Sequence, residues 1–208
     1  MQFSLPPTVP RERALHLELE SVKDGKTVCR EQHACFLILP AGAATAAGSA
    51  RFIGQDEKTQ GDWRGKYGKS GYEIAGATTE LPKDVRVDWA DAAVWVWAKS
   101  TSEPRALAGK DARRLAACRY ANEIDLFVEV PAAGRKLTLY YVDWDRGRAK
   151  QTFTLWDDEG RILDRRELGR LLGGCYLTWE IRGSVRITID HEGGPNAVVS
   201  GLFLDPAR

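Results

Sequence analysis

The sequence predicts an all-β protein of antiparallel strands, arranged as a sandwich or a barrel. Apolar and polar residues alternate with a period of two along many segments, which is typical of strands with one buried and one wet face. About ten such segments follow one another, and turn-forming residues separate them at short intervals. The only helical candidate, residues 102–116, contains a glycine and is too short for more than a turn or two.

The first part of the chain is predicted to be an N-terminal β-hairpin extension. Residues 1–39 contain two strand-like segments joined at Asp24-Gly25, a strong hairpin signal, and they form either this hairpin or the tail of a preceding domain. Residues 40–50 are small and include proline and glycine, which predicts a linker. Residues 51–208 are then the β-sandwich module.

The alternation assigns an inward face to the three clearest strands of the module. Tyr176 and Thr178 belong to the opposite, polar face of their strand. The inward residues are Ile124, Leu126, Val128 and Val130 in EIDLFVEV, Cys175, Leu177, Trp179 and Ile181 in CYLTWEI, and Val185, Ile187 and Ile189 in SVRITID.

Further strands and turns follow from the same pattern. Arg182-Gly183-Ser184 is predicted as a turn between two strands, and Asp158-Glu159-Gly160 as a hairpin turn. Residues 196–204, NAVVSGLFL, are apolar on both faces and are predicted as one central strand covered on both sides. The other predicted strands are VRVDWA, AVWVWAK, RLAACRY, KLTLYYVDW, QTFTLWD and ILDRREL.

Composition and charge exclude several classes of protein. Hydrophobic residues make up 43% of the chain and charged residues 28%, which indicates a globular protein. The formal net charge of +1 provides no general attraction for nucleic acid, and no apolar run is long enough to span a membrane. The N-terminus lacks a signal-peptide pattern, so we expect a cytoplasmic protein if the chain is complete. As a module of a longer secreted protein it would be extracytoplasmic.

The four cysteines are too sparse to define a disulfide scaffold. Cys118 and Cys175 lie in apolar strand-like segments, and we expect both to be free buried thiols. Cys29, His33 and Cys35 lie close together, but their spacing matches no familiar zinc-ligand pair. Whether Cys29 and Cys35 form a disulfide stays open at this point.

The segment GDWRGKYGKSGYEIAG, residues 61–76, combines five glycines with three aromatic residues. Its GKS resembles the end of a phosphate-binding loop, but Trp63 stands where that motif requires glycine, and no helical pattern follows. Trp63, Tyr67 and Tyr72 therefore either fold back to close one end of the sandwich or form a stacking face for a ligand.

A second candidate site is the strand end VDWDRGR. Here Trp144 lies between Asp143 and Asp145, with Arg148 nearby, and aromatic faces flanked by carboxylate and guanidinium groups suit sugar rings. Asp143 and Asp145 lie about 6.6 Å apart along a strand, a spacing that also permits a glycosidase pair. A strand-end Asp-x-Asp is also typical of a turn or of a calcium ligand, so a structural calcium ion is an alternative. Trp95, with its i+2 neighbour, is expected in the core or in a concave sheet lining.

Several motifs in order carry a resemblance to a known module. They are TQGDWRGKYGKSGYEIAG, LPKDVRV, WVWAKSTSEPRAL, RLAACRY, LTLYYVDWD, GGCYLTWEIRGSVRITI and GGPNAVVSGLFLD, within residues 52–204. The chain resembles an uncharacterised bacterial β-sandwich module that recurs in long extracytoplasmic proteins, some with glycan-active domains. This module is similar in architecture to galactose-binding-like jelly rolls and to carbohydrate-binding modules. The resemblance implies a jelly-roll sandwich, a glycan ligand and further domains as partners, but it assigns no binding residues.

Together these observations predict a non-catalytic carbohydrate-binding module. Its expected ligand is a glycan or polysaccharide, with no nucleic acid and no membrane span. A structural or protein-interaction domain without a small ligand is the alternative, and a glycan hydrolase using Asp143 or Asp145 is the third hypothesis. The expected ligand-binding residues are Trp63, Tyr67, Tyr72, Asp143, Trp144, Asp145 and Arg148.

Overall fold

The computed structural model describes residues 15–23, 26–36, 47–109 and 113–207. The chain divides into two compact units, Met1–Ala44 and Thr45–Arg208. In the first unit, β1 (Leu15–Lys23) and β2 (Lys26–Phe36) form an antiparallel pair. The predicted turn between them, at positions 24 and 25, lies outside the described residues, as do the cysteine and histidine side chains of β2.

The second unit is all-β, as predicted, and its described residues contain no helix. Every strand pair is antiparallel. The strands are β3 (Ser49–Asp56), β4 (Gly71–Ile74), β5 (Thr79–Glu80), β6 (Arg86–Asp88), β7 (Ala93–Thr101), β8 (Leu107–Ala108), β9 (Arg114–Ala121), β10 (Ile124–Tyr141), β11 (Lys150–Trp156), β12 (Ile162–Gly169), β13 (Cys175–Glu192), β14 (Ala197–Val199) and β15 (Gly201–Pro206).

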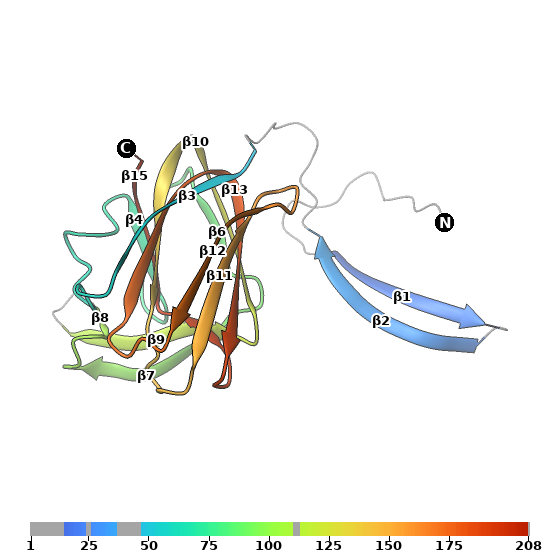
Figure 1. The fold of residues 1–208 in the computed structure, drawn as a ribbon, viewed down its shortest axis with the longest axis horizontal. Helices are drawn as coiled ribbons and strands as arrows, with labels where there is room; N and C mark the ends of the chain where they lie inside the picture. Colours follow the sequence, from blue (N-terminus) through green and yellow to red (C-terminus); the bar gives the residue numbers. More distant parts are fainter. Residues whose placement is uncertain (1–14, 24–25, 37–46, 110–112, 208) are drawn as a thin grey trace. The chain divides into compact units, whose positions relative to one another are not determined.

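These strands form a larger and a smaller sheet that share one hydrophobic core. The larger sheet has the order β12-β11-β13-β10-β15-β4-β5, with β3 paired to β13 and β6 paired to β10. The smaller sheet has the order β14-β9-β7, with β8 paired to β9. In Figure 1, β7 and β9 run across one end of the long strands β10 and β13. The core joins Cys118 of β9 and Val198 of β14 to Leu126 and Leu139 of β10.

The centre of the larger sheet is one long, bent pair formed by β10 and β13. The two strands stay paired from Ile124↔Ile189 to Tyr141↔Cys175, so the turn predicted at 182–184 is wrong. Residues 131–134 of β10 form a bulge there, opposite a single residue of β13. Gly134 has φ +83° and Gly183 has φ +64°, conformations that glycine adopts without strain. The two glycines therefore bend a continuous strand pair and do not reverse the chain.

The segment NAVVSGLFL also differs from its prediction, because it supplies a strand to each sheet. β14 pairs with β9 in the smaller sheet, and β15 pairs with β10 in the larger one. Ser200 lies between them, donating its backbone N–H to Tyr140 O at 2.9 Å and accepting one from Ala75 at 3.1 Å. The strong burial of this segment therefore reflects a crossing between two sheets. The sequence pattern alone does not distinguish this from one central strand.

The predicted inward faces are confirmed, but part of the outer face is buried as well. The inward residues of the three clearest strands are all at most 4% exposed. Tyr176, predicted on the polar face of β13, is 0% exposed because a second apolar layer covers it. We call this layer the outer cluster; it contains Trp63, Tyr72, Ile74, Leu107, Tyr140, Val142, Tyr176 and Phe203.

The prediction that Cys118 and Cys175 are free buried thiols is confirmed. Burial raises the pKa of each to about 12, so both stay protonated at neutral pH. Across the described part of the chain, we find no helix with the length and apolar character needed to span a bilayer.

Candidate functional site

Trp63 and Tyr72 fold back onto the sheet and form part of the outer cluster. The Trp63 ring is 3% exposed and packs against Tyr72 at 4.6 Å and Phe203 at 5.1 Å between ring centroids. Its indole Nε1 donates a hydrogen bond to the carbonyl of Ala108 at 2.9 Å. Of the two alternatives for this segment, the structure shows the first at these positions. The expected stacking face is absent at Trp63 and Tyr72 because protein atoms cover both rings.

The glycines of this segment allow the chain to lie closely against the outer cluster. Gly65 and Gly68 have φ values of +77° and +76°, and the carbonyl of Trp63 accepts hydrogen bonds from the backbone N–H groups of Lys66 and Tyr67. A Cβ atom at Gly68 would lie 3.3 Å from the Trp63 ring, a distance tighter than ordinary contact. The glycine-rich sequence is thus explained by tight local packing.

Two buried or partly buried carboxylates tie this segment to the sheet. Asp205 of β15 accepts backbone N–H groups from Gly68 at 3.0 Å and Lys69 at 2.9 Å. Asp56, at the end of β3, accepts hydrogen bonds from Lys66 Nζ at 2.6 Å and from the Tyr67 hydroxyl at 2.8 Å. Partial burial by itself would raise the pKa of Asp56, but its hydrogen bonds outweigh that effect and hold the pKa well below the usual range. The carboxylate therefore stays ionised.

Tyr67 is only half-buried, and it borders an open groove of about 680 Å³ on the outer face of the larger sheet. One face of its ring stacks on Tyr176, with centroids 4.4 Å apart and an interplanar angle of 17°. The hydroxyls of Thr138 and Thr178, 2.9 Å apart, belong to adjacent strands in the groove. The groove is lined by Ile53, Gly54, Gln55, Asp56, Lys66, Tyr67, Lys69, Lys136, Thr138, Thr178, Asp205, Pro206 and Ala207.

Asp143 and Arg148 form a buried ion pair that shapes the turn after β10. Asp143 is 0% exposed, and its Oδ1 accepts Arg148 Nη1 at 3.0 Å while its Oδ2 accepts the Arg148 backbone N–H at 3.2 Å. The Arg148 guanidinium also donates to the backbone carbonyl and side-chain Oδ1 of Asn196, at 2.7 and 2.6 Å. Neither charged group can touch a ligand, because neighbouring groups surround both. A hydrolase that uses the Asp143 carboxylate on substrate is therefore not supported.

The expected calcium ligands are engaged by other groups. Asp145 accepts the indole N–H of Trp97 at 3.0 Å and lies 3.8 Å from Arg148 Nη1. Where side chains are described, no group of three or more His, Cys, Asp or Glu residues is arranged to hold a metal ion. The Asp-x-Asp spacing at this strand end is therefore accounted for by hydrogen bonds and ion pairs within the protein.

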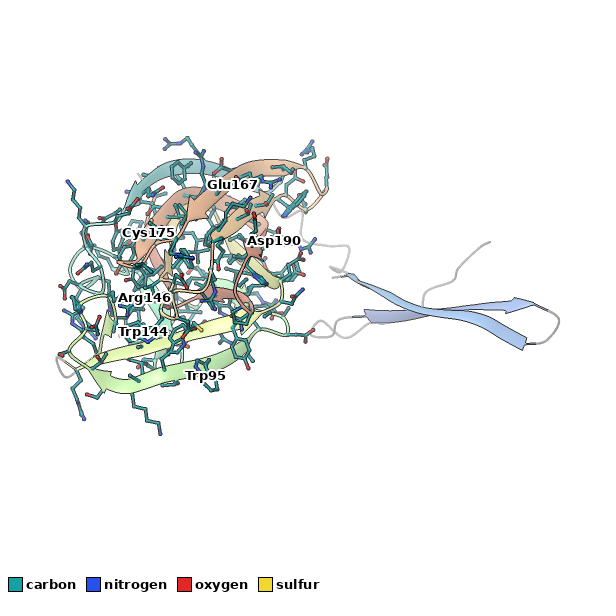
Figure 2. All side chains as sticks on the ribbon, turned by 60° about the horizontal axis from the view of Figure 1, so that its bottom comes forward. Trp95, Trp144, Arg146, Glu167, Cys175 and Asp190 are labelled. Atoms are coloured by element: carbon teal, nitrogen blue, oxygen red, sulfur yellow. The ribbon has the colours of Figure 1, made fainter. Side chains whose placement is uncertain are left out.

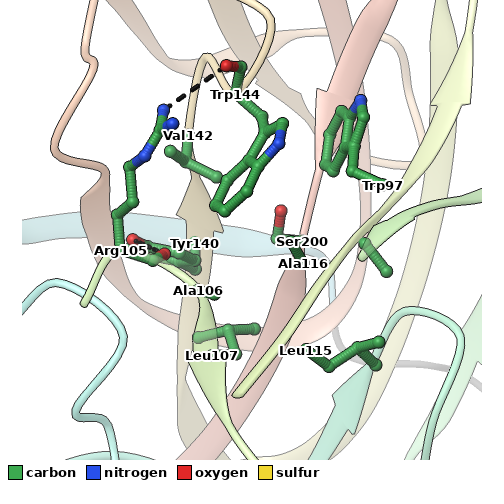
Figure 3. Close-up of a pocket in the computed structure, with 11 residues that line it drawn as sticks. Trp97, Arg105, Ala106, Leu107, Leu115, Ala116, Tyr140, Val142, Trp144 and Ser200 are labelled. Atoms are coloured by element: carbon green, nitrogen blue, oxygen red, sulfur yellow. Dashed lines mark hydrogen bonds between the residues drawn. The ribbon is translucent and has the colours of Figure 1, made fainter. Parts of the chain in front are cut away.

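Trp144 lies between Trp97 and Arg105, as Figure 3 shows. Its ring is stacked on Trp97 with centroids 5.9 Å apart, and the Arg105 guanidinium carbon lies 4.1 Å from its centroid. Both faces of Trp144 are thus occupied, so the ring cannot provide the expected stacking surface for a sugar. A crevice beneath it contains the Ser200 hydroxyl, which has no hydrogen-bond partner within the described residues. The crevice is lined by Trp97, Arg105, Ala106, Leu107, Leu115, Ala116, Ala117, Tyr140, Val142, Trp144 and Ser200.

Trp95 differs most from its predicted environment. The sequence favoured a core position, but the side chain is 55% exposed on β7, at the edge of the smaller sheet (Figure 2). Trp97, two residues further on, is partly buried and packs against the main core. The pairing of β7 with β9 has a register shift between Val96 and Ala98, so the period-two pattern does not hold from Trp95 to Trp97.

The expected ligand-binding residues do not come together in one site. The groove and the crevice share no lining residue, and of the seven predicted residues only Tyr67 lines the groove. The groove residues of β3, β10 and β13 were missed because they lie far apart in sequence. No local motif marks them, although two other groove residues, Lys66 and Lys69, lie within the glycine-rich segment 61–76.

Comparison with known proteins adds little. No protein-family model matches the chain, and no curated protein matches it. A solved structure of TmCBM61 in complex with beta-1,4-galactotriose is 15% identical and covers 72% of this chain and 92% of that one, with a TM-score of 0.21. At that TM-score the likeness supports no conclusion about this chain.

Proposed function

We propose that this chain is a carbohydrate-binding module and that the groove beside Tyr67 is its binding site. The observation that carries the proposal is the set of residues around this open space of about 680 Å³: nine of the thirteen lining residues have hydroxyl, carboxylate, amide or ammonium side chains. Sites for apolar ligands are lined predominantly by hydrophobic side chains. A groove rich in hydrogen-bonding groups fits a polyhydroxylated ligand better.

The groove also offers apolar surface, which a sugar needs for its C–H groups. Tyr67 borders it with the part of its ring that is left open by Tyr176 on one face and by Lys66 Nζ, 5.6 Å from the ring centroid. Ile53 of β3, which is 43% exposed, lines the groove as well. Tyrosine combines such apolar contact with a polar hydroxyl, which explains its frequent use in binding sites. Contact with these two side chains would add to the hydrogen bonds of the polar lining.

The walls of the groove are held in place before any ligand binds. Asp56 and Asp205 fix the segment that carries Lys66, Tyr67 and Lys69 through hydrogen bonds of 2.6–3.0 Å. Binding to such a prearranged wall requires less ordering of side chains and loops, and this lowers the cost of association. This arrangement supports a recognition role for the segment, beyond its role in packing.

A substitution at Gly54 tests the proposal. A Cβ atom at this position would meet nothing within 4 Å, so the side chain of Gly54→Tyr starts in open space at the wall of the groove. Gly169→Tyr is the matched control, since Gly169 also has open space, at the end of β12 and outside the groove. We expect the control to retain binding in affinity gel electrophoresis with a polysaccharide panel. Gly54→Tyr should weaken binding about tenfold or more, equivalent to at least about 1.4 kcal/mol.

The proposal would be rejected if the unmodified protein bound no plant, bacterial or host glycan. It would also be rejected if Gly54→Tyr bound as tightly as the control. Thermal unfolding of both variants distinguishes a blocked groove from a misfolded protein.

A protein-interaction domain is the second candidate function. The observation that favours it is the exposure of Trp95 and Val94, at 55% and 41%, on the edge strand β7. Unpaired edge strands can add a strand from another chain, and exposed tryptophan is enriched in interfaces. Sedimentation velocity tests self-association through this edge: Trp95→Ser should shift a dimer to a monomer. A protein that is monomeric at about 100 μM, far above the Kd range of stable complexes, would argue against that form of interaction.

A further inference from the structure

The charges of the groove show which kind of glycan it can bind. Three lysines line it, Lys66, Lys69 and Lys136, together with two aspartates, Asp56 and Asp205. Charged side chains that already bind each other contribute little to the free energy of ligand binding, whereas unpaired ones can form charge-assisted hydrogen bonds with the ligand. The selectivity of the groove therefore depends on which of these five groups are free.

Both aspartates already accept hydrogen bonds from the protein. Asp56 binds Lys66 Nζ and the Tyr67 hydroxyl through Oδ2, and Oδ1 accepts the backbone N–H groups of residues 58 and 59. Asp205 accepts one backbone N–H group on each carboxylate oxygen. A sugar hydroxyl would have to displace these donors to reach the Asp56 carboxylate, and Asp205 is only 9% exposed. The groove therefore offers neutral sugars few free acceptors of the kind that bind paired hydroxyls.

Two of the lysines are left without an acidic partner among the described residues. Lys69 is exposed on the segment beside Tyr67, and Lys136 is half-buried in the centre of the sheet. Two acidic residues lie opposite Lys136 in strand register, Asp205 on β15 and Glu180 on β13. Asp205 accepts backbone N–H groups from the Tyr67 segment, and Glu180 is bound by Arg51 at 2.9 Å and Arg182 at 3.2 Å. The three lysines of the groove outnumber its two aspartates, which leaves one net positive charge, and the ammonium groups of Lys69 and Lys136 form no ion pair within the described residues.

We propose that the ligand of this groove is an anionic glycan whose carboxylate or sulfate groups are bound by Lys69 and Lys136. This inference rests on the carbohydrate-binding function proposed above and specifies its ligand class. Ammonium groups donate to carboxylate or sulfate oxygens through short, strong hydrogen bonds, while Tyr67 and Ile53 contact the sugar ring. A nucleic acid is a less suitable polyanion, because the groove has a single aromatic ring for base stacking and the chain carries a net charge of only +1.

The test compares ligands that differ only in charge. Polygalacturonate and its highly methyl-esterified form share one backbone, and dextran sulfate and dextran share another. By isothermal titration we expect at least one of the two anionic forms to bind about tenfold or more tightly than its neutral counterpart. Equal affinity within both pairs would contradict the proposal. If only one of the two pairs shows this preference, that pair identifies the recognised anion as carboxylate or as sulfate. Raising the salt concentration from about 0.05 M to about 0.3 M should weaken the interaction.

Substitutions then assign the effect to the two lysines. Lys69→Met with Lys136→Met removes both charges and retains most of the apolar stem, so the double variant should lose about tenfold or more in affinity. Lys99→Met, on β7 outside the groove, removes a charge elsewhere and should change affinity by less than about twofold, which corresponds to about 0.4 kcal/mol.

Three further results would overturn the inference. One is a neutral glycan that binds the unmodified protein and the double lysine variant equally well but no longer binds Gly54→Tyr. The carbohydrate-binding function would then stand without the anionic preference. Another is an anionic glycan that still binds Gly54→Tyr, since its site would lie outside the groove. The third is an oligonucleotide that binds in the groove more tightly than every glycan. Failure to bind any glycan would refute the carbohydrate-binding function itself.

Discussion

Replacing Trp63 by alanine should destabilise the protein strongly, because this side chain holds the outer cluster together. The ring is 3% exposed, packs against Tyr72 and Phe203, and donates a hydrogen bond to the Ala108 carbonyl. Removing it deletes about 150 Å² of buried apolar surface, and at about 25 cal/mol per Å² this is about 4 kcal/mol. That value lies within the range of about 3–5 kcal/mol found for core tryptophan-to-alanine changes.

Urea unfolding monitored by far-UV circular dichroism measures this loss, with Trp95→Ala as the matched control. Trp95 is 55% exposed, so its removal should change the unfolding free energy by less than about 0.5 kcal/mol. For a chain of this size, 1 kcal/mol corresponds to about 2–4 °C in Tm, so Trp63→Ala should lower Tm by about 8–16 °C.

The reasoning would be refuted if the unfolding free energy of Trp63→Ala were within about 1 kcal/mol of that of the unmodified chain, since removing a fully packed tryptophan costs about 3–5 kcal/mol. Loss of glycan binding by Trp63→Ala, with an unchanged free energy of unfolding, would contradict the burial of this ring most directly. It would mean that the ring is exposed in solution and acts as a stacking face.

Other variants test other parts of the structure. Arg148→Met leaves the Asp143 carboxylate buried without its partner, and this should cost about 3–5 kcal/mol in urea unfolding, whereas replacing both residues by apolar ones should cost less. Gly174→Ala should cost about 3 kcal/mol or more and lower protein yield, because Gly174 has φ +86° and an added Cβ would lie 2.0 Å from the Tyr140 hydroxyl. A hydrogen bond with a neighbouring aspartate of β13, with partial burial, raises the pKa of Glu123 to about 7 from 4.5. Because the pKa is higher in the folded state, this group favours folding below about pH 4.5 and loses that contribution as the pH rises through about 7. Glu123→Gln should therefore reduce the decline of the urea unfolding midpoint between pH 4.5 and pH 7.

Local patterns predicted the strands well, because alternation requires only that one face of a strand be dry. Ile124 to Val130 and Val185 to Ile189 point inward as their period-two pattern indicates. The errors occur where neighbouring segments change the environment. The segment around Gly183 has turn-forming residues, but it lies opposite a bulge in β10 and forms a bend within the continuous strand β13. Ser200 interrupts an apolar run at the point where the chain passes between sheets.

The site was predicted less well, since aromatic composition alone does not determine exposure. Trp63 and Trp95 are chemically the same side chain, yet one is covered by the outer cluster and the other is open on an edge strand. Tyr67 belongs to the groove as a result of its stacking on Tyr176, a residue more than a hundred positions away. Pairing across such distances leaves no periodic signal in the sequence.

The sequence by itself therefore determined an antiparallel all-β chain, its inward faces, its free buried thiols and the importance of the segment around Tyr67. Only the tertiary structure decided which aromatic rings are buried, which carboxylates are already bound, and which lysines are free in the groove. The physical reason is that alternation and turn chemistry are local properties of the backbone. Burial and charge pairing depend instead on strands that meet through hydrogen bonds between distant parts of the chain.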